Sequence, residues 1–502
     1  MSRPSFVERH KLWTPAQHAA SDALVQRIRE ERLELVRFAW PDLHGVLRGK
    51  TLTADAAVGA LRSGVKMVGT LLLKDTSHRT AYPVFQPGAG GVSASGFAGA
   101  ADVVMVPDPT TFRVLPWAES TGWVQCMAYL PDGRPAPLDP RHAAVTLQDQ
   151  LAQQGMGLTT GLEVEFHIYR ITGVPADPAQ ASWPPAPPEV ALLHPGFNHL
   201  TEQWFDLAEP ALRIVQRTAQ ALGLPLLSLE VELGPSQVEA VFGPCDALQS
   251  ADQMVLFRSA TKQALRRAGY HATFMCRPPF DNVISSGWHL HQSLRSLADG
   301  SNLFAQNAGG VPDQPLSAVG MHWLGGLLHH AHANAALACP TSNGYARYRG
   351  STMAPQLAVW GHDNRGALMR VVDTDSPAAR VENRAGEPLA NPYLYIASQL
   401  AAGLDGLQHR RNPGPATENP YQPGSSLLLP QTLEDALAAL GESELLRQPW
   451  GQGLGADLID HVVHVKRAEL ARRDAHAGAS AGNPGQSKDH RAWEHAEYFG
   501  VF

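Results

Sequence analysis

The chain has 502 residues, of which 44% are hydrophobic and 17% charged, so it can bury a large core and is not a disordered or fibrous polypeptide. Forty Lys and Arg residues against 47 Asp and Glu residues give a net charge of −7, which argues against a basic surface for nucleic acid. The first residues lack the apolar core of a signal peptide, histidines interrupt the apolar stretch at 324–340, and the four cysteines form no CxxC pair; we therefore expect no export, no membrane span and a reducing, cytoplasmic location.

The first part of the chain has the pattern of a small α+β domain. β-like runs at 33–40 and 46–53 flank a turn, and a further strand is expected at 101–107. A Pro-rich break follows at 130–142. We therefore predict an amino-terminal domain over residues 20–130.

The rest of the chain, residues 131–502, is predicted to be a second and larger α+β domain. Helical segments at 142–155 and 252–269 alternate with strands at 161–169 and 287–294.

Two segments of the larger domain are predicted to lie outside regular structure. Residues 171–190, rich in Pro and Ala, are expected to form a surface loop or flexible insertion, and residues 474–490 are expected to be similarly mobile.

Paired carboxylates are the most informative feature of the predicted strand at 161–169. Glu163 and Glu165 alternate with apolar residues, so both project from one face of the strand and could share a cation. The alternative is an edge strand whose polar face meets water.

Two further segments carry candidate ligands. Glu232 and Glu239 flank a Gly-Pro-Ser turn that can bring them toward one point. His289 and His291 share one strand face, which Ser293 continues, although a structural role is the ordinary interpretation of either histidine alone.

Glu382 lies between Arg380 and Arg384 on another alternating run, where an ion-paired strand is the alternative. Taken together, the five glutamates and one histidine offer two sets of hard ligands, suited to Mg²⁺ or Mn²⁺ handling phosphate oxygens.

Five arginines cluster in the same part of the sequence. Guanidinium groups at this density suit carboxylate and phosphate recognition, so the pattern favours ATP-dependent chemistry on an acid. They are Arg347, Arg365, Arg370, Arg380 and Arg384.

The order of these motifs resembles the glutamine synthetase family. The matching motifs are ExE at 163–165, E-x-GPxQ-x-E at 232–239, SGxHxH at 286–291, NGYARY at 343–348 and RVENR at 380–384. The resemblance is strong over residues 130–410 and fainter in the amino-terminal domain.

The resemblance implies a fold and an assembly. It implies a β-grasp amino-terminal domain and a catalytic domain with a curved antiparallel sheet and helices. It also implies a homo-oligomer, a dodecamer of two hexameric rings with active sites between subunits.

The resemblance also implies roles for residues. One divalent ion would be held by Glu165, Glu232 and Glu239, and a second by Glu163, His289 and Glu382. His291, Ser293, Arg370 and Arg380 match ATP-contacting positions, Arg347 and Arg384 match positions that bind glutamate or face phosphate, and Arg365 matches the arginine that faces the transferred phosphoryl group.

The activity implied is that of a carbon–nitrogen ligase. ATP phosphorylates the side-chain carboxylate of glutamate, and an amine attacks the resulting acyl phosphate to give a γ-glutamyl amide, while the site excludes water.

The sequence departs from the ammonia-using members at two acidic elements. Met353 stands where their flap carries a glutamate, and residues 82–100, where an acidic loop is expected, contain no acidic residue. A neutral amine, hydrophobic or aromatic, is therefore the favoured acceptor, with Met353 and Phe97 as candidate lining residues unless they serve ordinary packing.

Other interpretations remain open at this point. Ile284-Ser285 replaces the family's usual Asn-Gly, so glutamate is favoured chiefly by the retained Arg347 and Arg384. The alternatives are an ammonia-dependent glutamine synthetase, a γ-glutamylpolyamine synthetase, or a catalytically silent metabolite-sensing homologue, against which the complete ligand set counts.

Overall fold

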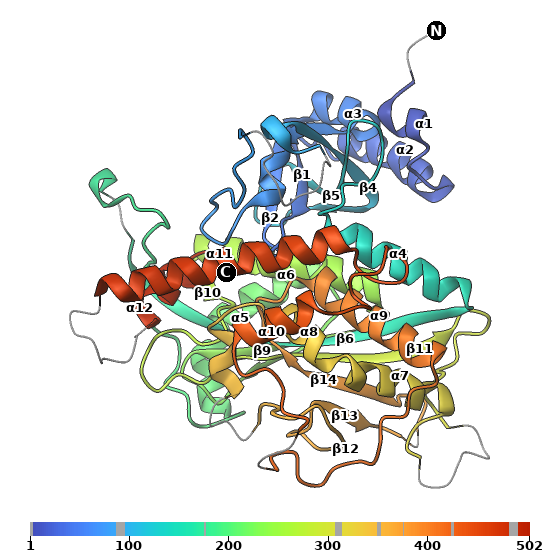
Figure 1. Cartoon of the computed structure of the whole chain (residues 1–502). Coiled ribbons are helices and arrows are strands. Elements are labelled where there is room, and N and C mark those ends of the chain that lie inside the picture. Colours follow the sequence, from blue (N-terminus) through green and yellow to red (C-terminus); the bar gives the residue numbers. More distant parts are fainter. Residues whose placement is uncertain are drawn as a thin grey trace.

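The computed structural model describes residues 4–86, 96–174, 177–306, 314–348, 353–374, 376–422, 426–480 and 490–502. The described chain forms two units, each built on its own sheet. Figure 1 shows the smaller, amino-terminal unit in blue above the larger unit, with the long helix α11 (Ala456–Ser480) crossing the larger unit. The α+β class expected from the sequence is confirmed.

The amino-terminal unit is a five-stranded sheet in the order β2-β1-β5-β4-β3. The first two strands pair antiparallel, as the runs at 33–40 and 46–53 predict, whereas β1 and β5 are parallel neighbours. The strand expected at 101–107 begins at Asp102 and continues to Val114. The bounds are β1 Leu35–Pro41, β2 Leu47–Thr53, β3 Val65–Val68, β4 Asp102–Val114 and β5 Thr121–Tyr129.

Three helices pack on this sheet: α1 (Phe6–His10), α2 (Pro15–Glu30) and α3 (Ala54–Ser63). A capping box at Thr14, with Pro15 in the first turn, fixes where α2 begins. The first helix and the start of the second precede residue 20 and belong to the same packed unit. The domain division at residues 130 and 131 stays a prediction.

The larger unit is built on a nine-stranded sheet, in the order β12-β13-β14-β11-β6-β9-β8, with β10 and β7 pairing with β6. All its pairings are antiparallel except that of β12 with β13. The bounds are β6 Met156–Gly173, β7 Glu189–Leu192, β8 Leu226–Val231, β9 Gln237–Asp246, β10 Tyr270–Thr273, β11 Trp288–Ser296, β12 Trp360–His362, β13 Met369–Val372 and β14 Arg380–Gly386.

The long strand β6 lies in the middle of this sheet, between β11 and β9. The edge-strand alternative for residues 161–169 is therefore wrong. The apolar residues Leu162, Val164 and Phe166 are fully buried, and Phe166 makes an edge-to-face contact with Phe257 of the helix layer. The alternate residues are thereby directed to the opposite face of the sheet.

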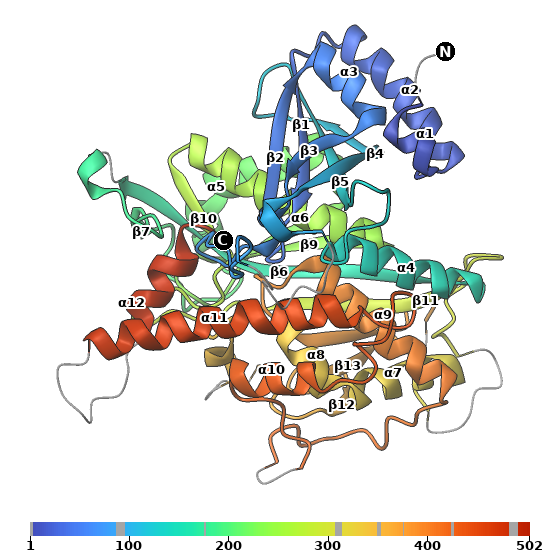
Figure 2. The ribbon, with the colours of Figure 1, turned by 45° about the horizontal axis from the view of Figure 1, so that its top comes forward.

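Helices cover the apolar face, and α9 lies at their centre, packed against α4, α6, α7 and α8. Figure 2 shows this layer with α11 along its outer side. The bounds are α4 Pro140–Gln153, α5 Glu202–Ala221, α6 Ala247–Arg267, α7 Ala318–His329, α8 Ala331–Ala338, α9 Pro392–Gln408, α10 Leu433–Gly441 and α12 Arg491–Glu494.

The two segments predicted to be loops contain regular structure. At 171–190, β6 continues to Gly173 and pairs with β7, which begins at Glu189, so the segment is the tip of a hairpin. At 474–490, α11 extends through Ser480, because its Ala-rich composition favours helix, and residues 481–489 lie outside the described part. The expectation of loop structure is therefore wrong for residues 171–173, 189–190 and 474–480, whereas residues 177–188 contain no strand or α-helix, as expected for a surface loop.

The amino-terminal unit contacts α11 through a buried histidine. His461 approaches Tyr82, with 3.0 Å between Nδ1 and the phenol oxygen, and its Nε2 lies 3.0 Å from the main-chain oxygen of Leu72. Burial lowers the pKa of His461 to about 3, so the ring is neutral in the folded protein.

All four cysteines are free thiols, as the sequence predicts. Among the described residues, every helix is too short or too polar to cross a bilayer.

Candidate active site

The sheet register brings the predicted ligands together from four strands. His289 of β11 lies directly opposite Glu163 of β6, and Glu239 of β9 lies opposite Glu165. Glu382 of β14 faces β11 from the other side. Side chains separated by more than 200 residues in the sequence therefore share one face of the sheet.

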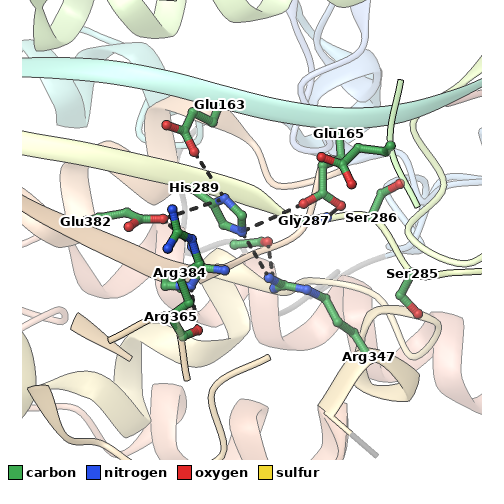
Figure 3. Close-up of polar contacts among 12 residues, drawn as sticks. Glu163, Glu165, Ser285, Ser286, Gly287, His289, Arg347, Arg365, Glu382 and Arg384 are labelled. Atoms are coloured by element: carbon green, nitrogen blue, oxygen red, sulfur yellow. Dashed lines mark hydrogen bonds and ion pairs between the residues drawn. The ribbon is translucent and has the colours of Figure 1, made fainter. Parts of the chain in front are cut away.

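Glu163, His289 and Glu382 form the tighter of two groups, here called the histidine cluster. One donor atom from each lies within 4.8 Å of the other two. The Nδ1 atom of His289 is 3.4 Å from the Glu163 carboxylate and 3.6 Å from the Glu382 carboxylate. Figure 3 shows the three side chains pointing toward one another, as a common cation would require.

Protein cations offset the negative charge of the histidine cluster. Arg370 donates to Glu382 at 2.9 Å, and Arg384 donates to the other oxygen of the same carboxylate. Burial by itself would raise the pKa of Glu163, but His289 and His291 outweigh it and lower that pKa well below its ordinary value. The pKa of Glu382 is also lowered, because His289 and Arg384 outweigh burial.

Glu165, Glu232 and Glu239 form the second group, here called the carboxylate cluster. Burial and the neighbouring Glu232 raise the pKa of Glu165 to about 7. Burial and the neighbouring Glu165 raise the pKa of Glu239 to about 10. Among the described residues, only the histidine cluster brings three donor atoms within 4.8 Å of one another, so the carboxylate cluster is the looser group.

Three residues that were given no role from the sequence contact the carboxylate cluster. Gln237 donates to Glu165 at 3.1 Å, and the main-chain nitrogen of Gly287 donates to the same oxygen at 2.9 Å. His199 lies 3.4 Å from Glu232. Gln237 belongs to the E-x-GPxQ-x-E motif and could have been found from it, whereas His199 lies outside every motif.

Two of the five predicted arginines are buried at the site. Arg347, on the 3₁₀ turn Gly344–Tyr348, donates to the Gly386 oxygen at 3.1 Å and lies 3.4 Å from His289. Arg384 donates to the main-chain oxygen of Arg365 at 2.9 Å. The side chain of Arg365 itself is exposed, so only its main chain is brought to the cluster.

A cavity of about 440 Å³ opens beside the histidine cluster. Three of the four residues predicted to contact ATP line it: His291, Ser293 and Arg380. The fourth, Arg370, does not line the cavity and instead binds Glu382 and Asp363. The apolar wall includes Phe242, which the sequence did not single out.

The two candidate amine-lining residues differ in exposure. Met353 is 55% exposed, and residues 349–352 before it lie outside the described part. Phe97 is only 4% exposed and packs against Gly69 in the amino-terminal core. Phe97 therefore serves ordinary packing in this unit, and the alternative interpretation is the better one. Most of the loop without acidic residues, at 87–95, also lies outside the described part.

The sequence identifies the class of protein that this fold and site define. Residues 137–479 match the family described as "Glutamine synthetase, catalytic domain". The chain therefore belongs to the glutamine synthetase family and is an ATP-dependent carbon–nitrogen ligase.

The chain is similar to two named relatives and to one solved structure over most of its length. The chain is 37% identical to the "Gamma-glutamylanilide synthase" of an Acinetobacter species, over 99% of both chains. It is 30% identical to the glutamine synthetase of Pyrococcus furiosus, over 84% of this chain and 88% of the relative. The solved GmaS/ADP complex in its first conformation superposes with a TM-score of 0.74, at 29% identity, over 90% of this chain and 96% of that chain.

Proposed function

We propose that the protein joins the γ-carboxylate of glutamate to a primary amine with a hydrophobic or aromatic group, at the expense of ATP. The observation that carries the proposal is the pair of ligand clusters on one face of the sheet, together with 37% identity to a γ-glutamylanilide synthase. The reaction passes through a γ-glutamyl phosphate.

The donor sets fit two or more divalent cations. Glu163, His289 and Glu382 would hold one ion, and Glu165, Glu232 and Glu239 would hold another. The mutual repulsion that raises the pKa values of Glu165 and Glu239 is relieved when a cation binds between them. All these ligands are hard or borderline donors, which suits Mg²⁺ or Mn²⁺, and such ions offset phosphate charge during transfer.

The nucleotide is proposed to occupy the 440 Å³ cavity. His291, Ser293 and Arg380 on its walls would contact ATP, and Arg370 would assist from its place on Glu382. Apolar wall residues such as Phe242 suit a base, while the adjoining histidine cluster suits the phosphates. The similarity to a solved ADP complex supports this assignment.

Arginines are proposed to bind the acid and the transferred group. Arg347 and Arg384, both buried, would face the carboxylate and the phosphoryl oxygens, with Arg365 supplying a further charge. A glutamate side-chain oxygen attacks the terminal phosphorus of ATP and ADP departs. The amine nitrogen then attacks the activated carbonyl, inorganic phosphate leaves with the carbon–oxygen bond electrons, and the nitrogen releases a proton.

The acceptor is proposed to be uncharged when it binds. An aromatic amine is neutral at pH 7 and needs no carboxylate to attract it or to remove a proton before attack, whereas ammonium needs both. Met353, exposed at the end of the segment where ammonia-using relatives carry a glutamate, suits the neutral amine. Ammonia-dependent glutamine synthesis is the second candidate, because relatives at about 30% identity carry that name.

Family members are typically oligomeric. We propose for this chain a double hexameric ring with active sites between subunits, in which a neighbour's amino-terminal unit completes the amine site.

Phosphate release with ATP, glutamate and Mg²⁺ across a panel of amines tests the proposal. We expect turnover with aniline to exceed turnover with ammonium, and we expect a product with the mass of γ-glutamylanilide. Turnover with ammonium alone would favour glutamine synthesis, and no ATP consumption with any amine would favour a silent homologue.

A further inference from the structure

Residues 196–200 form a short segment that lies along the carboxylate cluster. The main-chain nitrogen of Phe197 donates to the Leu233 oxygen at 2.7 Å, and that of Leu200 donates to the Val231 oxygen at 3.3 Å. Glu232 therefore lies between the two residues, Val231 and Leu233, that this segment binds. The segment is fixed at its start because Gly196 fits tightly against the Gly234–Pro235 turn, where a Cβ would come within 2.4 Å of the Pro235 nitrogen.

Large apolar side chains are exposed around Glu232. Phe197 is 57% exposed, Leu200 55% and Leu233 43%. Phe197 and Leu200 both have positive φ angles, of 56° and 57°, which bulky residues rarely adopt. A group of exposed apolar side chains beside polar site residues is typical of a binding surface and not of a solvated loop.

Ile284 extends this apolar surface toward Glu165. A Cβ atom placed on Gly234 would come within 2.9 Å of the Cβ atom of Ile284, so the two residues are in close contact. The next residue, Ser285, accepts from Gln237 through its main-chain oxygen, and Gln237 also donates to Glu165. Figure 3 shows Ser285, Ser286 and Gly287 following one another past Glu165. The surface of Phe197, Leu233 and Ile284, here called the apolar rim, therefore borders the carboxylate cluster.

We propose that the apolar rim is the contact surface for the aromatic ring of the amine substrate. This inference rests on the proposed function and deepens it by naming residues that determine acceptor specificity. The rim offers carbon surface to the ring, while its border with the carboxylate cluster keeps the amino group near the reacting acid.

The size of the rim favours a small molecule over a second copy of the chain. A stable protein interface buries about 800 Å² on each partner, whereas three side chains cover roughly the area of one aromatic ring. The occupant that fits is therefore an arylamine, with aniline as the probe.

The test compares Michaelis constants for aniline, glutamate and ATP in the wild type, Phe197→Ala and Leu233→Ala. Leu207→Ala is the matched control, because Leu207 is 41% exposed on α5 and belongs to no part of the site. Loss of ring contact should raise the KM for aniline by about tenfold in both rim variants, since one missing apolar contact in a pocket is worth roughly that factor. The glutamate and ATP constants should stay within about twofold of the wild type.

Each outcome bears on one proposal. If the wild type uses ammonium but not aniline, the proposed function fails before the variants are made. If the wild type uses aniline and both rim variants keep its KM, the assignment of the rim is overturned while the function stands. A parallel rise for aniline and glutamate, or dissociation of the oligomer without a selective change, would also overturn it. Should circular dichroism show that Phe197→Ala is unfolded, Leu233→Gln decides in its place.

Discussion

The histidine cluster and the carboxylate cluster are neighbours on one sheet, yet the protein treats their charges in opposite ways. In the first, Arg370 and Arg384 bind Glu382 and two histidines face Glu163, so the pKa values of both carboxyls are lowered. In the second, burial and mutual repulsion raise the pKa of Glu239 to about 10. The same residue type on the same sheet thus ends in contrasting states.

The contrast shows how charge compensation is divided between protein and cation. The histidine cluster is held together by the chain itself, because protein cations neutralise it without any ligand. The carboxylate cluster has only neutral donors to Glu165, from Gln237 and one main-chain N–H, and it limits its negative charge by keeping Glu239 protonated. Its fully ionised form therefore depends on an added cation for charge balance.

The largest expected effect is loss of activity when either cluster is broken. Glu232→Ala and Glu382→Ala should each lower the rate of amide formation by about a thousandfold or more, because phosphoryl transfer loses charge compensation. Glu230→Ala is the matched control: Glu230 lies on β8 opposite Glu239 but is assigned to neither cluster. Near-normal turnover of Glu382→Ala would contradict the ligand assignment.

Removal of a carboxyl group should change the free energy of unfolding in opposite directions in the two clusters. In the absence of metal, Glu382→Gln removes the carboxylate that Arg370 and Arg384 share, and of the two only Arg370 keeps another carboxylate partner, Asp363. The substitution should lower the free energy of unfolding by about 3–5 kcal/mol. Glu239→Gln replaces a carboxyl that already keeps its proton at pH 7 when folded but ionises when unfolded, so it should raise that free energy by about 1–3 kcal/mol. Chemical denaturation with EDTA measures both changes.

Addition of metal sharpens the same comparison. Mg²⁺ or Mn²⁺ stabilises the wild type by binding the folded state, and Glu239→Gln should reduce that stabilisation because it removes a ligand. Destabilisation of both variants without metal would show that the carboxylate cluster is compensated by the chain after all.

The flap offers a test of intermediate size. Met353→Glu should raise turnover with ammonium relative to aniline by about tenfold, because a carboxylate attracts the ammonium ion and accepts its proton. The ratio of kcat/KM values for the two amines measures the change, and Leu207→Glu, a similar substitution on the exposed face of α5, controls for added surface charge. An unchanged ratio would show that Met353 does not face the acceptor.

Much of the site could be predicted from sequence because strand alternation fixes which side chains share a face. Glu163 with Glu165, and His289 with His291, were placed by the period of two. Sequence alone leaves open which strands are neighbours, and the register of β6 with β9 and β11 decides which residues meet. Recognition of the family supplied that pairing for the two clusters.

What could not be predicted depends on tertiary contacts. His199 reaches Glu232 only because residues 196–200 bind the main chain of Val231 and Leu233, and nothing in the local sequence marks His199 as a site residue. Phe97 was only a candidate for the amine site, with ordinary packing as the alternative, because hydrophobicity alone does not distinguish a pocket wall from a core position. Helix propensity was underestimated in the Ala-rich segment that continues α11 to Ser480.

The smallest expected effect concerns the pH dependence of stability that arises from His461, a buried base without a counter-charge. Burial lowers the pKa of His461 to about 3, against about 6.5 in an unfolded chain. Between these values the unfolded state binds more protons, so stability is full above pH 6.5 and declines as the pH falls. His461→Gln removes this titration while an amide can still donate to the Leu72 oxygen.

The free energy of unfolding, measured by denaturant titration at pH 6.5 and pH 5, should fall by about 1–2 kcal/mol less in His461→Gln than in the wild type. His464→Gln is the matched control, because His464 lies on the same helix, is exposed, and approaches the Ala81 oxygen at 2.8 Å. Equal pH dependence in the wild type and His461→Gln would mean that His461 gains a compensating charge or water on protonation. Burial without a counter-charge would then not govern the charge state of a side chain in this fold, and the contrast between the two clusters would need another cause.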